Sequence, residues 1–192
     1  WECADPGLQF DTTINRWHTT PVSGRINGSN PCSEYVHLDN SACNLSSLNL
    51  LNFLNDDNEF DVDGFRHAVR IMITAQEILV SPSDYPNETI GDNARKYRQL
   101  GLGYTNLGAL LMALGLAYDS DDARSLAAVI TAIMTGEAYK TSSQIAARLG
   151  AFEGYDLNKE AMLSVLNAHR EAIAKIPVNE AVPPALRAAA VE

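Results

Sequence analysis

The chain has 192 residues, of which 46% are apolar and 20% are charged, and its formal net charge at pH 7 is −10. The apolar fraction suffices for a buried core, whereas the negative charge excludes strong binding to nucleic-acid backbones and to anionic membranes. No apolar run is long enough to cross a bilayer, and three cysteines, an odd number, favour reactive thiols in the reducing cytoplasm over a fully paired secreted scaffold.

The first 60 residues are predicted to contain few regular elements. Turn-forming residues at the start of the chain lead into a short helix or an irregular segment over residues 8–14. Two short strands are expected over residues 35–38 and 41–45, with a tight turn at residues 39–40 between them. An apolar cluster over residues 48–54 ends this region.

From residue 61 onwards the hydrophobic pattern is typical of helices. One face of the first helix is expected to be buried, and it consists of Phe65, Ala68, Val69, Met72, Ala75 and Leu79. Gly101 and Gly103 are interpreted as a tight turn into a helix, because Asn106 stands where a phosphate-binding glycine motif needs its third glycine. Further helices are predicted over residues 87–97, 105–114, 119–149 and 158–175, and a last one begins at Pro183 and Pro184.

The clearest candidates for chemistry are Asn30, Cys32 and Glu34, which stand two positions apart. Pro31 biases Asn30 towards an extended backbone, and in an extended segment alternate side chains share one face. An amide, a thiol and a carboxylate on one face can hydrogen-bond a sugar, exchange a hydrogen atom with it and accept a proton. A purely structural interpretation is also open. Cys32 and Cys43 could be buried thiols or form a disulfide, Glu34 could be a solvated carboxylate, and Asn30 could be a turn residue.

No protein-bound metal site is predicted. No pair of His or Cys residues stands at the spacing of C-x-x-C or H-x-x-x-H. The acidic residues at 119–122 are interpreted as a helix start, because a calcium loop needs alternating acids and a terminal Glu. The histidines that lack metal-ligand spacing are His18, His37, His67 and His169.

Several sequence blocks, taken in order, resemble the large, catalytic subunits of ribonucleotide reductases. The blocks are DPGLQF from Asp5, TINR from Thr13, NPCSEYVHLDNSACNLSSLNL from Asn30 and RQLGLGYTNLGA from Arg98. The similarity is greatest to the adenosylcobalamin-dependent (class II) branch. It implies an α/β fold: a fragment of the ten-stranded α/β barrel, mostly helical with a few short strands. Residues 1–192 would be a partial catalytic barrel domain, with the active-site loop and strands in 1–60 and the helical part in 61–192.

The resemblance also implies a role for each candidate residue. Cys32 matches the cysteine that becomes a thiyl radical and removes the 3′-hydrogen of the ribose. Glu34 matches the general base for the 3′-hydroxyl, and Asn30 matches the residue that holds the sugar hydroxyls. Cys43 matches one member of the redox-active cysteine pair, whose partner lies upstream of this chain. Cys3 lies outside every matched motif and is assigned no role.

The implied cofactor is adenosylcobalamin as the source of the radical, with its binding residues not identified. The implied partners are a ribonucleotide substrate, dNTP and ATP effectors, a thioredoxin-like reductant and, in the full-length enzyme, a second copy in a homodimer. A ribonucleoside diphosphate is the favoured substrate, and a triphosphate stays open as the alternative. The chain is interpreted as an internal piece of a longer enzyme that does not turn over alone. Two alternatives stay open: a class I large subunit served by a separate metallo-radical subunit, and a non-catalytic helical interaction module.

Overall fold

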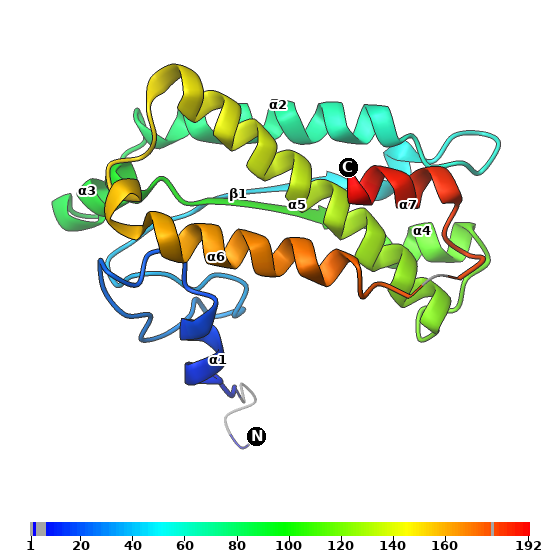
Figure 1. Cartoon of the computed structure of the whole chain (residues 1–192), viewed down its shortest axis with the longest axis horizontal. Coiled ribbons are helices and arrows are strands. Elements are labelled where there is room, and N and C mark those ends of the chain that lie inside the picture. The colour runs from blue at the N-terminus through cyan, green and yellow to red at the C-terminus, as the bar shows by residue number, and fades with distance from the viewer. Residues whose placement is uncertain (1, 3–6, 178) are drawn as a thin grey trace. The chain divides into compact units, whose positions relative to one another are not determined.

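The computed structural model describes residue 2 and residues 7–177 and 179–192 of the chain, and Figure 1 labels most of its elements. A turn was predicted over residues 4–7, of which 4–6 lie outside the described residues, as does Cys3. Residue contacts divide the chain into two compact units. Unit 1 comprises Trp1–Cys43, Asp84–Gln99 and Phe152–Ala168, and unit 2 comprises Asn44–Ser83, Leu100–Ala151 and His169–Glu192. In chain order the elements are α1 (Asp11–Arg16), β1 (Asn44–Asn49), η1 (Leu50–Phe53), α2 (Val62–Val80), α3 (Glu88–Tyr97), β2 (Leu100–Thr105), α4 (Leu107–Ala113), α5 (Asp121–Leu149), α6 (Tyr155–Ile173) and α7 (Pro184–Val191).

Three of the predicted helices begin at side chains that cap them. The side-chain oxygens of Asp61, Asn87 and Ser120 each accept a hydrogen bond from the backbone N–H of the third residue of α2, α3 and α5. Such caps satisfy N–H groups that have no partner inside the helix. Helix α5 ends at Gly150, whose φ of +90° favours glycine. These helices were predicted correctly, as were α4, α6 and α7 to within a few residues, and α1 lies where a short helix or an irregular segment was predicted.

Strands β1 and β2 form a parallel pair in unit 2, in a register that runs from Asn44 opposite Leu100 to Asn49 opposite Thr105. The predicted tight turn at Gly101 and Gly103 was therefore wrong, because both glycines lie inside β2. The predicted strand over residues 35–38 is also absent from the described structure, and β1 begins only at Asn44. Parallel pairing joins segments that are distant along the chain, so a local sequence pattern does not reveal it.

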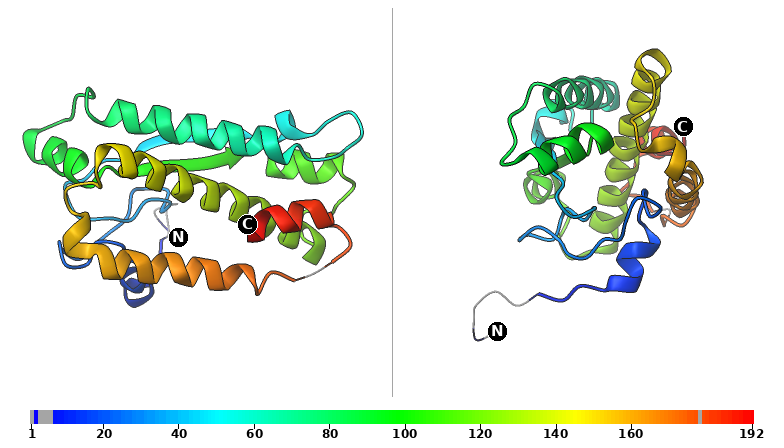
Figure 2. Two further views of the ribbon diagram at one scale, coloured as in Figure 1. Left: turned by 45° about the horizontal axis from the view of Figure 1, so that its top comes forward. Right: turned by 90° about the vertical axis from the view of Figure 1, so that its left-hand side faces the viewer.

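Helix α2 packs against both strands and against α5, and the views in Figure 2 show α2 and α5 side by side. Its buried face contains Phe65 and Val69, as predicted, but continues through Ile73, Gln76 and Val80. Leu79, which was expected in the core, is 54% exposed. Gln76 belongs to the buried face because its side chain donates hydrogen bonds to backbone carbonyls of both strands.

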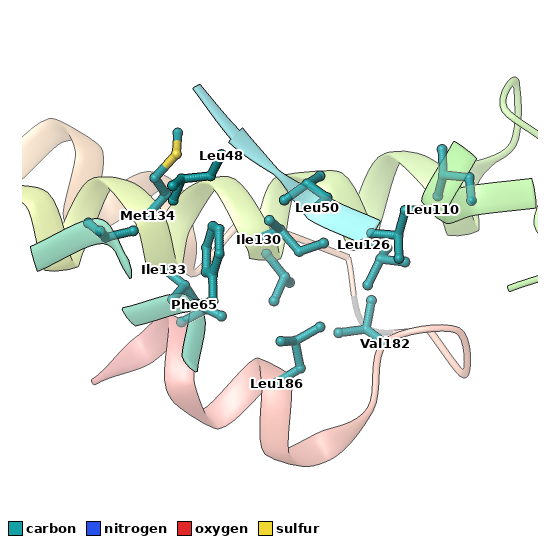
Figure 3. Packing of buried hydrophobic residues seen from close by; sticks show 14 of the residues in the cluster. Leu48, Leu50, Phe65, Leu110, Leu126, Ile130, Ile133, Met134, Val182 and Leu186 are labelled. Carbon is teal, nitrogen blue, oxygen red and sulfur yellow. The ribbon is translucent and has the colours of Figure 1, made fainter. Parts of the chain in front are cut away.

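The hydrophobic core of unit 2 lies between α2, α5, α7 and the two strands (Figure 3). Side chains from β1 and α2 meet those of α5, and α7 adds a further row. Labelled in the figure are Leu48, Leu50, Phe65, Leu110, Leu126, Ile130, Ile133, Met134, Val182 and Leu186. A mostly helical chain with two parallel strands agrees with the predicted fragment of an α/β barrel, and the complete ten-stranded barrel stays a prediction. Within the described residues, we find no helix with the length and apolarity to span a membrane.

Buried polar side chains connect segments of unit 1. Asn158, which is 1% exposed, accepts a hydrogen bond from the backbone N–H of Val22 and donates to Ser23 Oγ and to the carbonyl of Gly154, at 2.9, 2.7 and 2.8 Å. His18 accepts from the N–H of Thr20 on Nδ1 and donates from Nε2 to a backbone carbonyl. Because buried polar groups need partners, these bonds define the path of residues 18–24 ahead of the candidate site.

Candidate functional site

The Asn30–Tyr35 segment forms a closed turn. Ser33 donates its N–H to the carbonyl of Asn30 at 3.0 Å, and Asn30 donates its N–H to the carbonyl of Tyr35 at 3.2 Å. The N–H of Tyr35 in turn donates to Asn30 Oδ1 at 3.0 Å. The expected extended strand with alternating side chains was therefore wrong. Pro31 occupies the second position of the turn, where its fixed φ is favourable, and the side chain of Asn30 supplies the closing acceptor.

A second set of contacts supports this turn from outside. Gln9 donates from Nε2 to Ser29 Oγ at 3.1 Å and to Ser33 Oγ at 2.9 Å, and Ser29 Oγ donates to the carbonyl of Asn30 at 3.0 Å. Ser33 has a φ of +66°, a left-handed conformation that costs a non-glycine residue about 1 kcal/mol. The contacts of Gln9 and Ser29 help to hold Ser33 in that conformation, which presents the neighbouring Cys32 at the tip of the turn.

The two candidate cysteines are both thiols in very different surroundings. Cys32 is exposed, and Cys43 is half-buried. Burial, and to a smaller degree the nearby charge of Glu34, raises the pKa of Cys43 to about 11. At neutral pH Cys43 therefore keeps its proton, whereas Cys32 is open to a reactant. The structure thus excludes the interpretation of these two residues as a disulfide, and that of Cys32 as a buried structural thiol.

Tyr35 lies between the turn and Cys43, and no local sequence signal indicated its importance. Its phenol oxygen is 2.8 Å from Ser41 Oγ, which in turn donates to the carbonyl of Leu38 at 2.5 Å. Burial raises the pKa of Tyr35 to about 12; the hydrogen bond to Ser41 opposes this shift, and the nearby Cys43 adds to it. The electrostatic effect of Cys43 on Tyr35, and of Glu34 on Cys43, places these three side chains close together.

His37 anchors the other side of this region. Its Nδ1 accepts from Gln99 Nε2 at 2.8 Å, so that its Nε2 carries the hydrogen and donates to Thr20 Oγ1 at 3.2 Å. Burial, together with the nearby His18, lowers the pKa of His37 to about 4. The ring is therefore neutral at physiological pH. A pocket of about 340 Å³ lies against it in unit 1, lined by Thr13, Ile14, Trp17, His18, Thr19, Ile26, Val36 and His37.

The structure places each of the four predicted site residues in unit 1. Asn30 and Cys32 lie in one turn, and Glu34 directly follows this turn. Glu34 is near enough to Cys43 for its charge to raise the pKa of that thiol. Across the described part of the chain, no group of three or more His, Cys, Asp or Glu side chains is arranged to hold a metal ion. The turn thus carries an exposed thiol with an amide two residues before it and an exposed carboxylate two residues after it, and the second, protonated thiol follows at Cys43.

Comparisons with known proteins identify the family of the chain. Residues 1–181 match the family model described as "Ribonucleotide reductase, barrel domain". The chain is 55% identical over 176 residues to a vitamin B12-dependent ribonucleotide reductase of Streptomyces clavuligerus, which covers 90% of this chain and 18% of the relative. It is 52% identical over 192 residues to the protein of the same name from Rhodopirellula baltica, covering 100% of this chain and 18% of the relative. It is also 37% identical over 151 residues to a vitamin B12-dependent ribonucleoside-diphosphate reductase of Mycobacterium tuberculosis, covering 79% and 22%.

The chain thus spans about a fifth of the length of the curated relatives that it matches. The matched region includes the turn with Cys32, the segment with Cys43 and both strands of the parallel pair. Because the family model covers nearly all of the sequence, the chain belongs to the ribonucleotide reductase barrel-domain family.

Proposed function

We propose that this chain is part of the catalytic barrel of an adenosylcobalamin-dependent ribonucleotide reductase, which converts ribonucleoside diphosphates to deoxyribonucleotides. The observation that carries the proposal is the exposed thiol of Cys32, presented on a closed turn beside Asn30 and Glu34. The names of the relatives supply the reaction and the vitamin B12 dependence, and the name of the mycobacterial relative supplies the diphosphate substrate. The cytoplasmic location stays a prediction.

The surroundings of Cys32 fit the proposed cofactor, because a hydrogen atom is transferred only between groups in contact and this sulfur is accessible. Adenosylcobalamin, when bound, would supply radical chemistry, and the Cys32 thiol is the group that would give up its hydrogen atom. We assign no other described residue to holding the cofactor. The Cys32 sulfur then takes the 3′-hydrogen of the ribose and later returns it.

Asn30 and Glu34 would act on the sugar hydroxyls. The Oδ1 of Asn30 accepts the N–H of Tyr35, so its Nδ2 is the atom suited to hold a hydroxyl oxygen of the substrate. Glu34 stands two residues after Cys32 and is exposed. Its carboxylate would accept the proton of the 3′-hydroxyl. These two roles together orient the ribose with its 3′-hydrogen towards Cys32.

Cys43 would supply reducing equivalents with a second cysteine from outside this chain. Two thiols become one disulfide, the substrate gains the two electrons and two hydrogens, and its 2′-hydroxyl leaves as water. The elevated pKa of Cys43 supports this role, because the thiol still carries the hydrogen that the reaction consumes. A thioredoxin-like reductant would restore the pair; dNTP and ATP effectors and a homodimer belong to the same proposal for the full-length enzyme.

The test compares Cys32→Ser, Cys43→Ser and Cys3→Ser in the intact enzyme. Cys32→Ser should abolish both the reduction and the exchange of the substrate 3′-hydrogen. Cys43→Ser should abolish the reduction while the exchange persists, and Cys3→Ser is the matched control with unchanged turnover. A Cys32→Ser enzyme that folds and still reduces ribonucleotides contradicts the proposal and favours a non-catalytic module. Turnover that needs a second metal-containing subunit and no cobalamin favours a class I enzyme.

A further inference from the structure

We propose that Tyr35 is a positioning residue that holds the Cys32 turn in place relative to the segment carrying Cys43, through the hydrogen bond between its phenol and Ser41. This inference rests on the proposed function, because it assigns a role within the same site. Nothing in the Tyr35 side chain would touch the reacting atoms; it would act through the two cysteines that it connects.

The backbone of Tyr35 forms one end of the turn. Its N–H donates to Asn30 Oδ1 at 3.0 Å, and its carbonyl accepts from the N–H of Asn30 at 3.2 Å. Both bonds join the same two residues on either side of Cys32. A displacement of Tyr35 therefore moves the closing end of the turn and with it the thiol.

The side chain of Tyr35 reaches the second segment, and the direction of its hydrogen bond follows from Ser41. A serine hydroxyl has one hydrogen, and Ser41 donates it to the carbonyl of Leu38. The phenol of Tyr35 must therefore be the donor in the 2.8 Å contact with Ser41 Oγ. Ser41 precedes Cys43 by two residues, so this bond links the turn to the segment that carries the second thiol.

Both ends of the link are restrained by further contacts. The ring of Tyr35 stacks on His37 with centroids 6.3 Å apart and an interplanar angle of 17°, and His37 is itself bonded at both ring nitrogens. On the other side, Asn93 donates from Nδ2 to the carbonyl of Asn40 at 2.9 Å. Burial keeps the pKa of Tyr35 near 12, so the phenol remains a donor throughout the physiological range.

Two restrained segments joined by one hydrogen bond have a defined spacing, and reactions between positioned groups lose rate steeply when that spacing changes. The step that needs both segments is the reduction, in which Cys43 delivers its hydrogen to a sugar held at the Cys32 turn. The position of Asn30, which would hold the sugar, depends on its backbone bonds to Tyr35, and these remain when the phenol oxygen is removed. Loss of the phenol oxygen should therefore lower kcat and leave KM nearly unchanged.

The experiment uses Tyr35→Phe, Ser41→Ala and the double variant in the intact enzyme. Ser41→Thr retains the hydroxyl, and Tyr118→Phe is a matched control because Tyr118 is 70% exposed. We expect kcat to fall about tenfold in each single variant, as the loss of one partly buried hydrogen bond predicts, with KM within about twofold. The double variant should be no slower than the singles, because both remove the same bond. Ser41→Thr and Tyr118→Phe should turn over like the unaltered enzyme.

A second readout does not depend on reductase activity. The alkylation rate of Cys43 at fixed pH, followed by mass spectrometry of its peptide, should rise in Tyr35→Phe and Ser41→Ala as the segment loosens. If the unaltered enzyme reduces no ribonucleotide but the alkylation changes as expected, the proposed function fails and the link stands. If alkylation is unchanged, or if the effects of the two substitutions on kcat multiply, the link itself is overturned.

Discussion

Gln76 offers a sharp test of how the two strands are joined, because its side chain bonds both of them. It is 3% exposed, and its Nε2 donates to the carbonyl of Asn44 at 3.0 Å and to the carbonyl of Gly101 at 2.8 Å. Asn44 returns a bond from Nδ2 to the main-chain carbonyl of Gln76 at 3.0 Å. Since Asn44 directly follows Cys43, this contact also holds the start of β1 at the residue next to the second candidate thiol.

We predict that Gln76→Met weakens the strand pair and that Gln76→Glu weakens it far more. Methionine has a similar length but removes two hydrogen bonds, at roughly 1 to 1.5 kcal/mol each. Methionine also removes the buried Oε1, which has no hydrogen-bond partner, and this stabilises the folded protein by about 1 kcal/mol. The net loss of about 1 to 2 kcal/mol corresponds to roughly tenfold more frequent opening. Glutamate instead sets carboxylate oxygens against two carbonyl oxygens, which adds at least ~2 kcal/mol and brings the increase above about a hundredfold.

The assay is hydrogen exchange of the backbone amides in peptides that cover residues 44–49 and 100–105 of the intact protein. Gln144→Met is the control, because Gln144 is exposed on α5. The loss of stability in Gln76→Glu should become smaller as pH falls, because a protonated carboxyl can donate one hydrogen bond. Burial beside two carbonyl oxygens raises the pKa of this carboxyl in the folded protein above its value in the unfolded chain. The free energy of unfolding therefore decreases as pH rises through the folded pKa. Exchange in Gln76→Glu at neutral pH that equals that of the unaltered protein would refute this account of the contact.

Two further predictions follow from the pKa shifts in unit 1. Alkylation of Cys43 should increase up to about pH 11 rather than levelling off near 9, and Glu34→Gln should lower that midpoint because it removes a nearby negative charge; an unshifted midpoint contradicts the placement of these residues. The pKa of His37 is lowered from 6.5 to about 4, so between these two pH values the unfolded chain binds a proton that the folded chain does not. The stability that His37 contributes at neutral pH is therefore lost as pH falls from 6.5 towards 4. An NMR titration of the ring should show this low midpoint, and His37→Phe should flatten the dependence of Tm on pH; a midpoint near 6.5 would contradict the burial of the ring.

Local signals accounted for most of the helices and for the identity of the candidate site residues. Asp61, Asn87 and Ser120 are capping residues that each accept a hydrogen bond from the N–H group three positions later, so a short sequence window contains the whole interaction. Gly150 ends α5 for an equally local reason. Asn30, Cys32, Glu34 and Cys43 were recognised from residue type and sequence blocks alone, and their chemical roles stay predictions.

Tertiary structure decided the features in which a residue's partner is distant or specific. Gly101 and Gly103 lie in a strand because β1 pairs with them from far along the chain, and Leu79 is exposed because Gln76 and Val80 face the core instead. The Cys32 segment is a turn because the Asn30 side chain closes on Tyr35, a choice that Pro31 permits but does not force. Helix caps are short-range bonds encoded within one turn of sequence, whereas strand pairing, helix rotation and the Tyr35 link to Ser41 depend on which surfaces the folded chain brings together.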